Sequence, residues 1–180
     1  LSSDMMTTKS DIEAYYGRLN DIYKHDCSKI AHKLMYLKDI HNTLSRLSDG
    51  STLDDIELFE VKHLAILSSQ IRNMLTEQNI AAITLPQLDK VVEILDPDKL
   101  NIPSFYIYDS YNEALREVRK QMKAIQAQGD DIAEDKRQEL AMLLQQHADL
   151  ELQVREQLSQ QLLAYVAPLT DTLDNLSCLD

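Results

Sequence analysis

The sequence predicts an all-α fold, a helical core bundle with a long protruding antiparallel two-helix lever arm. The chain has 3 glycines and 4 prolines in 180 residues, so it offers few tight turns. Its apolar residues recur at steps of three and four, the period of amphipathic helices. From 132 to 176 only Pro168 interrupts this pattern. A helix of that length would span roughly 65 Å, so part of it should stand out from the body.

Composition narrows the function classes. The net charge of −12 repels phosphate, which disfavours a broad nucleic-acid-binding surface. No apolar run approaches the roughly 20 residues of a membrane span, and the N-terminus lacks the basic and apolar regions of a signal peptide. Cys27 and Cys178 form neither a disulfide framework nor a zinc pattern. We therefore expect reduced thiols and a cytoplasmic location. Because the chain begins with Leu1 and not with Met, we also expect it to be a piece of a longer protein.

Two helices are predicted in the first fifty residues. Ser10 and Glu13 have the spacing of a capping box, which predicts a helix over 10–23. A second apolar series runs from Cys27 to Leu47 and predicts one amphipathic helix. That helix should end at Ser48–Ser51, where a glycine can adopt the left-handed conformation.

Two further helices complete the predicted core. Thr52 can cap a helix that continues to about residue 76, and acidic residues follow in its first turn. A shorter helix should follow Thr84, with Pro86 in its first turn. Pro97 ends it, because the residue before a proline is pushed out of helical geometry.

The arm follows an aromatic stretch, residues 100–109, which we interpret as a packed loop because a lone strand has no partner. Asp109 or Ser110 should cap the first arm helix, which covers 111–128 and breaks at Gly129. The second arm helix should run over 132–176 and pack antiparallel to the first through a seam of nearly seven-residue spacing.

These elements divide the chain into three parts. Residues 1–109 are predicted to form the helical core. Residues 110–168 should form the lever arm, two antiparallel helices that turn near Gly129. Residues 169–180 should return into the core and lead toward a further C-terminal domain.

The sequence contains no catalytic signature. The motifs GxxxxGK[ST], GxGxxG, HExxH, GxSxG and CxxC are all missing, so we expect no catalytic or cofactor-binding residue and no enzyme in this chain. His25, Asp26 and Cys27 are consecutive and would point in different directions on a helix. The run from Asp96 to Ile107 lacks the glycine and glutamate of a calcium loop. We therefore predict no metal site.

One candidate binding feature lies on the first arm helix. Four basic residues share a face at i, i+3, i+4 and i+7: Arg116, Arg119, Lys120 and Lys123. They could contact DNA phosphate or an acidic partner. The alternative is a solvated face, paired within the helix to Glu113 and Glu117, and the sequence leaves both open.

Three stretches, residues 53–64, 92–97 and 105–119, resemble the central core-and-lever domain of the MutS family of DNA mismatch-repair ATPases. In that family an extended patch after a core helix leads into a long lever helix. The lever begins with a Leu-x-x-Leu-Arg-like pattern, matched here by Leu115, Val118 and Arg119.

The chain departs from this family at two places. The family usually has an acidic residue where Arg116 stands. Its members insert a DNA-gripping clamp between the two levers, whereas the link here, 126–136, is too short for such a domain. The resemblance is therefore to a clamp-less MutS-related protein.

The resemblance implies a non-catalytic domain that transmits conformational change between an ATPase domain beyond Asp180 and the lever tip near Gly129. ATP and magnesium would belong to the parent protein. The implied partners are that ATPase domain and a second copy in a homodimer, with DNA contact at the tip possible and no membrane. The alternative is a free-standing helical adaptor that binds a partner protein through its arm. A helical-bundle carboxylate enzyme would need paired Glu-x-x-His steps, which are absent.

Overall fold

The computed structural model describes residues 9, 11–14, 16, 27–81 and 83–179, and within them it contains helices, turns and loops without a strand. The predicted all-α class is confirmed. Of the helix predicted over 10–23, residues 11–14 and 16 are described and are helical, and the rest lies outside the described residues.

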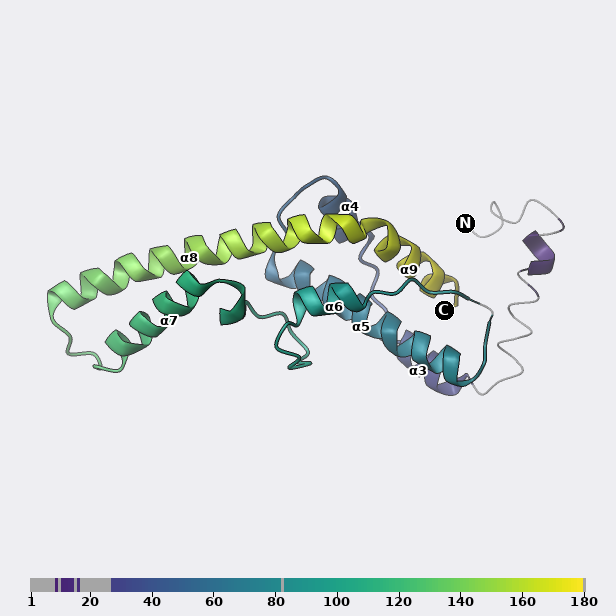
Figure 1. Ribbon diagram of the computed structural model, residues 1–180, viewed down its shortest axis with the longest axis horizontal. Coiled ribbons are helices and arrows are strands. Elements are labelled where there is room, and N and C mark those ends of the chain that lie inside the picture. Colours follow the sequence, from purple (N-terminus) through teal and green to yellow (C-terminus); the bar gives the residue numbers. More distant parts are fainter. Residues whose placement is uncertain (1–8, 10, 15, 17–26, 82, 180) are drawn as a thin grey trace.

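The helical body is organised around α5 (Asp55–Glu77). This helix packs against α3 (Ser28–Leu34), α4 (His41–Ser48), α6 (Asp89–Leu95) and α9 (Val166–Leu179). Along α5 the buried apolar residues follow the helical period, from Leu58 and Val61 to Ile71 and Leu75. Figure 1 shows α3, α6 and α9 packed along this central helix. The main hydrophobic core therefore lies around α5.

The start of α5 has a capping box, at Asp54 rather than at the predicted Thr52. The amide of Glu57 donates to Asp54 Oδ1 (2.8 Å), and the amide of Asp54 donates to Glu57 Oε1 (3.2 Å). The reciprocal bonds satisfy two amides that the first turn leaves unpaired. The predicted end near residue 76 is confirmed, because α5 ends at Glu77.

The single helix predicted from Cys27 to Leu47 is wrong, because the chain breaks between α3 and α4. The apolar steps of three and four continue across the break, so periodicity alone could not reveal it. Asp39 Oδ1 accepts a hydrogen bond from the amide of His41 (3.0 Å), a local bond that competes with helix formation. The break lets Ile40, 2% exposed, enter the core.

The helix predicted to start at Thr84 instead starts at Asp89, so Pro86 lies in the preceding loop and not in the first turn. Its predicted end at Asp96–Pro97 is confirmed. Residues 96–112, which we call the connecting loop, lead from α6 through a short 3-10 turn, η1 (Asp109–Tyr111), to the next helix.

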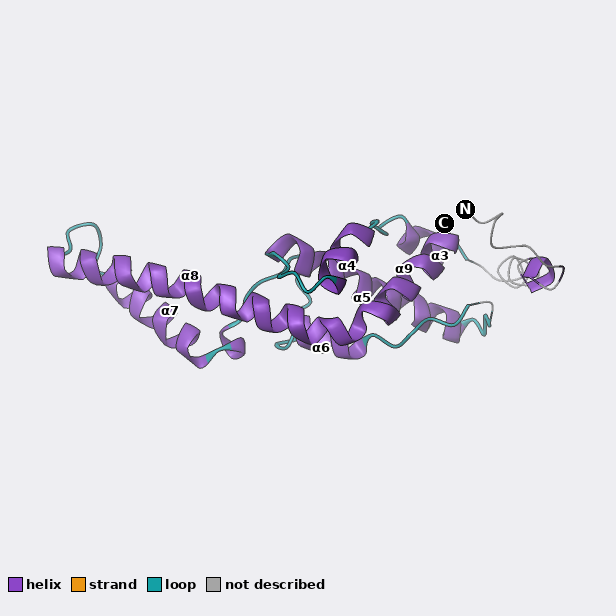
Figure 2. Ribbon diagram, turned by 90° about the horizontal axis from the view of Figure 1, so that it is seen from above, coloured by secondary structure: helices purple, strands orange, loops and turns teal. Residues whose placement is uncertain are grey.

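The next two helices, α7 (Glu113–Gln126) and α8 (Glu134–Leu162), pack against each other and form a hairpin. Gly129 lies between them with φ of 84°, a conformation that favours glycine. The cap of α7 is Asn112, whose Oδ1 accepts from the amide of Leu115 (3.0 Å), and not Asp109 or Ser110 as predicted. Figures 1 and 2 both show this hairpin extending away from the helical body.

The continuous helix predicted over 132–176 is interrupted. α8 ends at Leu162, η2 (Leu163–Tyr165) is a 3-10 turn, and α9 begins at Val166. Pro168 has no N–H, and in a continuous α-helix its ring would clash with the carbonyl four residues earlier, at Ala164. The chain therefore tightens into the 3-10 turn directly before α9, and α9 packs against α4 and α5 (Figure 1).

Among the described residues, most buried apolar side chains fall into two clusters. The main core includes Val154, Leu158 and Leu162 of α8, whereas the hairpin has its own small cluster of Val118, Ile125 and Leu143. Leu150 packs against both clusters from its partly buried position. Helix α8 therefore belongs to the body at one end and to the hairpin at the other. None of the described helices combines the length and apolar character needed to cross a bilayer.

The account of α8 predicts unequal effects for two neighbouring leucines. Leu162 is 0% exposed and Leu163 is 40% exposed. We expect Leu162→Ala to lower the free energy of unfolding by about 2–5 kcal/mol, because it leaves a cavity in the main core. Leu163→Ala, the matched control, should cost less than about 1 kcal/mol. Urea unfolding measures both values, and equal losses would contradict this packing.

Candidate functional site

The four predicted basic residues do not form one exposed stripe. Arg116, Lys120 and Lys123 are exposed on α7, but the side chain of Arg119 is only 14% exposed. Arg116 Nη1 pairs with Glu113 Oε2 (3.2 Å), as the alternative interpretation predicted. The predicted pairing of Glu117 with Lys120 is wrong, because Glu117 Oε1 accepts a hydrogen bond from the side-chain Nε2 of Gln121 (3.2 Å). Three of the four residues remain available to a partner.

Arg119 is instead the centre of a group that we call the polar layer: Arg119, His147, Glu151 and Asp109. It lies where the hairpin meets the connecting loop. The guanidinium of Arg119 donates to four acceptors: Asp109 Oδ1 (2.7 Å), the Ile107 carbonyl (2.7 Å), His147 Nε2 (3.2 Å) and Glu151 Oε2 (3.5 Å). It also lies over the ring of Tyr106 (5.3 Å to the centroid). The planar fork of an arginine suits such multiple recognition.

The polar layer was not predicted from the sequence, although a signal was present. From the sequence alone, Asp109 was a possible helix cap and His147 had no assigned polar role. His147 and Glu151 stand four apart on the face of α8 that meets α7, so two polar groups interrupt the seam between the two helices. A polar pair at seam positions indicates a partner across the seam, and Arg119 supplies it.

Buried polar groups hold the connecting loop together and fix it to the body. Within the loop, Asp96, 5% exposed, accepts from the amides of Leu100 and Asn101 (both 3.0 Å) and from the Tyr108 hydroxyl (3.2 Å). Burial, together with the Asp96 charge, raises the pKa of Tyr108 to about 12. The Tyr111 hydroxyl donates to the Ile94 carbonyl (2.6 Å), and burial raises its pKa as well.

Lys62 of α5 also holds this loop. The side chain is fully buried, and its Nζ donates to the carbonyls of Ser104 (3.0 Å) and Ile102 (3.3 Å). Burial lowers the pKa of Lys62, and the Asp96 charge partly offsets that effect. A buried ammonium that lost these acceptors would be left unpaired at considerable cost. The loop is therefore bound to the body at both α5 and α6.

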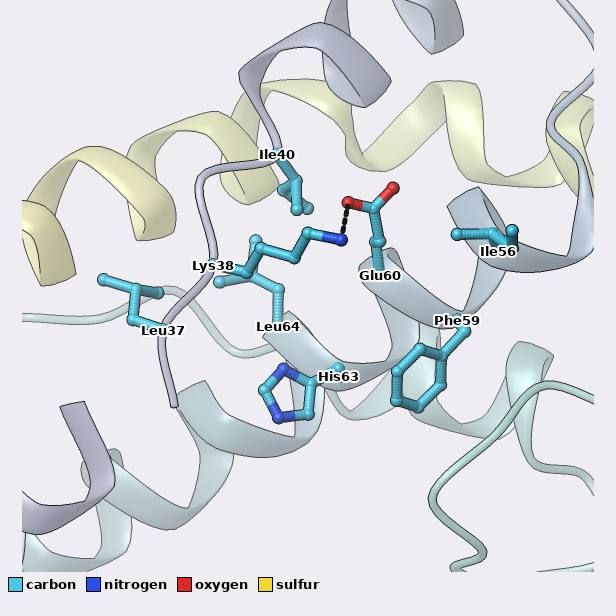
Figure 3. A pocket seen from close by; sticks show the side chains of 8 residues that line it. All are labelled: Leu37, Lys38, Ile40, Ile56, Phe59, Glu60, His63 and Leu64. Carbon is cyan, nitrogen blue, oxygen red and sulfur yellow. Dashed lines mark ion pairs between the residues drawn. The ribbon is translucent and has the colours of Figure 1, made fainter. Parts of the chain in front are cut away.

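Figure 3 shows a separate hollow between α5 and the segment that joins α3 to α4. Its walls are mainly apolar, with Phe59 and Ile56 on one side, and its residues are Leu37, Lys38, Ile40, Ile56, Phe59, Glu60, His63 and Leu64. Lys38 Nζ and Glu60 Oε2 form an ion pair across it (3.1 Å). Burial lowers the pKa of His63. The mainly apolar walls can accept an apolar side chain.

His41 joins the start of α4 to α9. Its Nδ1 lies 2.6 Å from Asp39 Oδ1 and its Nε2 lies 2.8 Å from Asp174 Oδ1. Hydrogen bonding to Asp174, and then to Asp39, raises the pKa of His41. A protonated imidazole donates from both nitrogens, so the charged form fits this position best.

No group of three or more metal-ligating side chains gathers anywhere in the described part of the chain. No protein-family model matches the sequence, and no curated protein matches it at a significant level.

The position of His41 predicts a pH dependence of stability. Because its folded pKa is raised, His41 stabilises the fold fully below its unfolded pKa of about 6.5, and this contribution is lost as pH rises through the folded pKa. The gap in urea midpoint between wild type and His41→Gln should therefore shrink from about pH 5.5 to about pH 8.5.

His63 provides a control of opposite sign. Its folded pKa is lowered by burial, so its contribution is lost as pH falls through the unfolded pKa. The gap between wild type and His63→Gln should widen with rising pH over the same range. Gaps that change in the same direction for both variants would contradict the two environments described here.

Proposed function

We propose that this chain is the non-catalytic core-and-lever domain of a MutS-related DNA mismatch-repair or DNA-recombination protein. In this proposal it transmits conformational change between a C-terminal ATPase domain and the tip of the hairpin near Gly129. ATP and magnesium act in the ATPase domain of the parent protein, a homodimer, and this chain supplies no catalytic residue.

One observation carries the proposal: α8 takes part in both hydrophobic clusters. Its last third packs in the main core through Val154, Leu158 and Leu162, and its first half packs on α7. Because packed helices move as units, a displacement of α9 or of the end of α8 would reach the hairpin tip.

Polar contacts support the same coupling at the body end of α8. Arg155 Nε and Nη2 donate to the two carboxylate oxygens of Asp55 (2.7 and 3.3 Å). The buried Ser159 hydroxyl accepts from the amide of Leu53 (2.9 Å). These bonds fix α8 to the start of α5, the central helix of the body, and directional bonds of this kind hold one register.

A second candidate function is a helical adaptor. The sequence suggests an adaptor that binds through its arm, and the hollow of Figure 3 adds a binding surface on the helical body. Its apolar walls, with Ile56 69% exposed, could receive an apolar side chain of a partner protein. The adaptor proposal requires no ATPase domain, which separates the two proposals.

The coding DNA that follows the codon for Asp180 tests the proposal. We expect it to encode, within about a hundred codons, a strand followed by GxxxxGK[ST], the phosphate-binding loop of an ATPase. A stop codon close to residue 180 would instead favour the adaptor.

The exposed basic residues give a second prediction, that the hairpin contacts nucleic acid. In an anisotropy titration with labelled duplex at low salt, neutralising Arg116, Lys120 and Lys123 should weaken binding. It should also reduce the slope of log K against log salt by up to about 3, because each lost phosphate contact removes about one released counterion.

A matched control changes the same charge on the helical body. Lys29, Arg72 and Lys90 are exposed there, and their triple Gln substitution should leave binding and salt slope unchanged. Undetectable binding by the wild type at low salt, or an equal loss in both triple variants, would refute a hairpin contact.

A further inference from the structure

We propose that the polar layer around Arg119 is a latch that holds the hairpin in one orientation relative to the body. A role of the latch in transmitting conformational change rests on the proposed function, whereas its effect on the orientation of the hairpin does not. The inference begins from the two hydrophobic clusters, which are separate although α8 runs through both.

The polar layer lies between the apolar contacts that hold each part together. Arg119 follows Val118, a member of the hairpin cluster, and Glu151 follows Leu150, which packs on both clusters. The side chains of Arg119, His147 and Glu151 are 14%, 23% and 23% exposed, so the layer is largely shielded from water. Apolar contacts are non-directional and tolerate sliding, whereas hydrogen bonds in such a layer select one arrangement.

The acceptors of Arg119 belong to different parts of the molecule. Asp109 and the Ile107 carbonyl are in the connecting loop, which is fixed to the body by Lys62 of α5 and by the bond from Tyr111 to α6. His147 and Glu151 are on α8, in the hairpin. One side chain of α7 therefore bonds the hairpin to a loop that moves with the body.

Release of the latch would be a discrete event. A hairpin that pivots away from the connecting loop takes Arg119 from Asp109 and the Ile107 carbonyl together, because both bonds are made by the same nitrogen, Nη1. A shielded guanidinium that loses charge-assisted bonds carries a substantial penalty. The hairpin should therefore occupy the latched orientation, with a minor pivoted one.

Two spin labels can measure this orientation in the full chain. Cysteines at Arg72 on α5 and Ala124 on α7 are exposed positions on the body and the hairpin, in a background where Cys27 and Cys178 are changed to Ser. Electron–electron resonance then gives the distribution of distances between them. We expect one dominant distance in the parent chain.

Arg119→Met keeps much of the side-chain volume and removes the donors. We expect the ratio of pivoted to latched hairpin to rise about tenfold, seen as a second or broadened distance. Arg116→Met is the matched control, because Arg116 lies on the same helix and bonds only to Glu113 in the described structure. Its distribution should equal that of the parent chain.

An unchanged distribution in a folded Arg119→Met variant would overturn the latch, as would the same broadening in Arg116→Met. Should Arg119→Met fail to fold by circular dichroism, Asp109→Asn decides the question. Asp109 is half exposed, and its variant weakens the bond between hairpin and loop without burying an unpaired group. A second distance in that variant supports the latch, and a single unchanged one refutes it.

The test is independent of the proposed function, because it uses neither nucleotide nor DNA. A coding sequence without an ATPase domain would end the transmission proposal and leave the latch intact. An unchanged distance in Arg119→Met would end the latch and leave the transmission proposal to be judged by the coding sequence.

Discussion

The structure depends on one constraint, that helix α8 is shared by two hydrophobic clusters that do not merge. Its C-terminal part is fixed by the burial of Val154, Leu158 and Leu162, and by bonds from Arg155 to Asp55. Its N-terminal part packs on α7, where Leu143 belongs to the hairpin cluster. Because the backbone hydrogen bonds of α8 continue from one part to the other, the hairpin inherits its direction from the core. The packing of the C-terminal part of α8 in the core therefore sets the position of the hairpin.

Buried polar groups give this arrangement its specificity. Lys62 and Asp96 each satisfy several groups of the connecting loop, and Arg119 satisfies acceptors from that loop and from α8. Each would be costly to leave unpaired, so the loop, the hairpin and the body favour one relative placement. Apolar burial supplies most of the stabilising free energy, and these directional bonds define which of several similar packings is occupied.

Much of the fold could be predicted from local signals, and the failures share a cause. The turn at Gly129, the end of α5 and the helical class follow from glycine, proline and apolar spacing. The break between α3 and α4 could not be predicted, because Leu34, Leu37 and Ile40 keep helical spacing across it. Apolar periodicity indicates which residues are buried and does not show whether the helix is continuous. Arg119 was assigned to an exposed face for a similar reason, since its partners Asp109 and Glu151 are 10 and 32 residues distant. Local pattern cannot specify such pairs.

The projection of the hairpin from the body is the central claim, and a single distance tests it. A spin label at exposed Gln138, near the start of α8, pairs with one at the native, exposed Cys178 of α9 after Cys27 is changed to Ser. If α8 and α9 lie nearly end to end, as Figure 1 shows, the labels should be about 55 Å apart, a little less than along one straight helix. A distance below about 40 Å would mean that the hairpin folds back on the body, and would contradict the account.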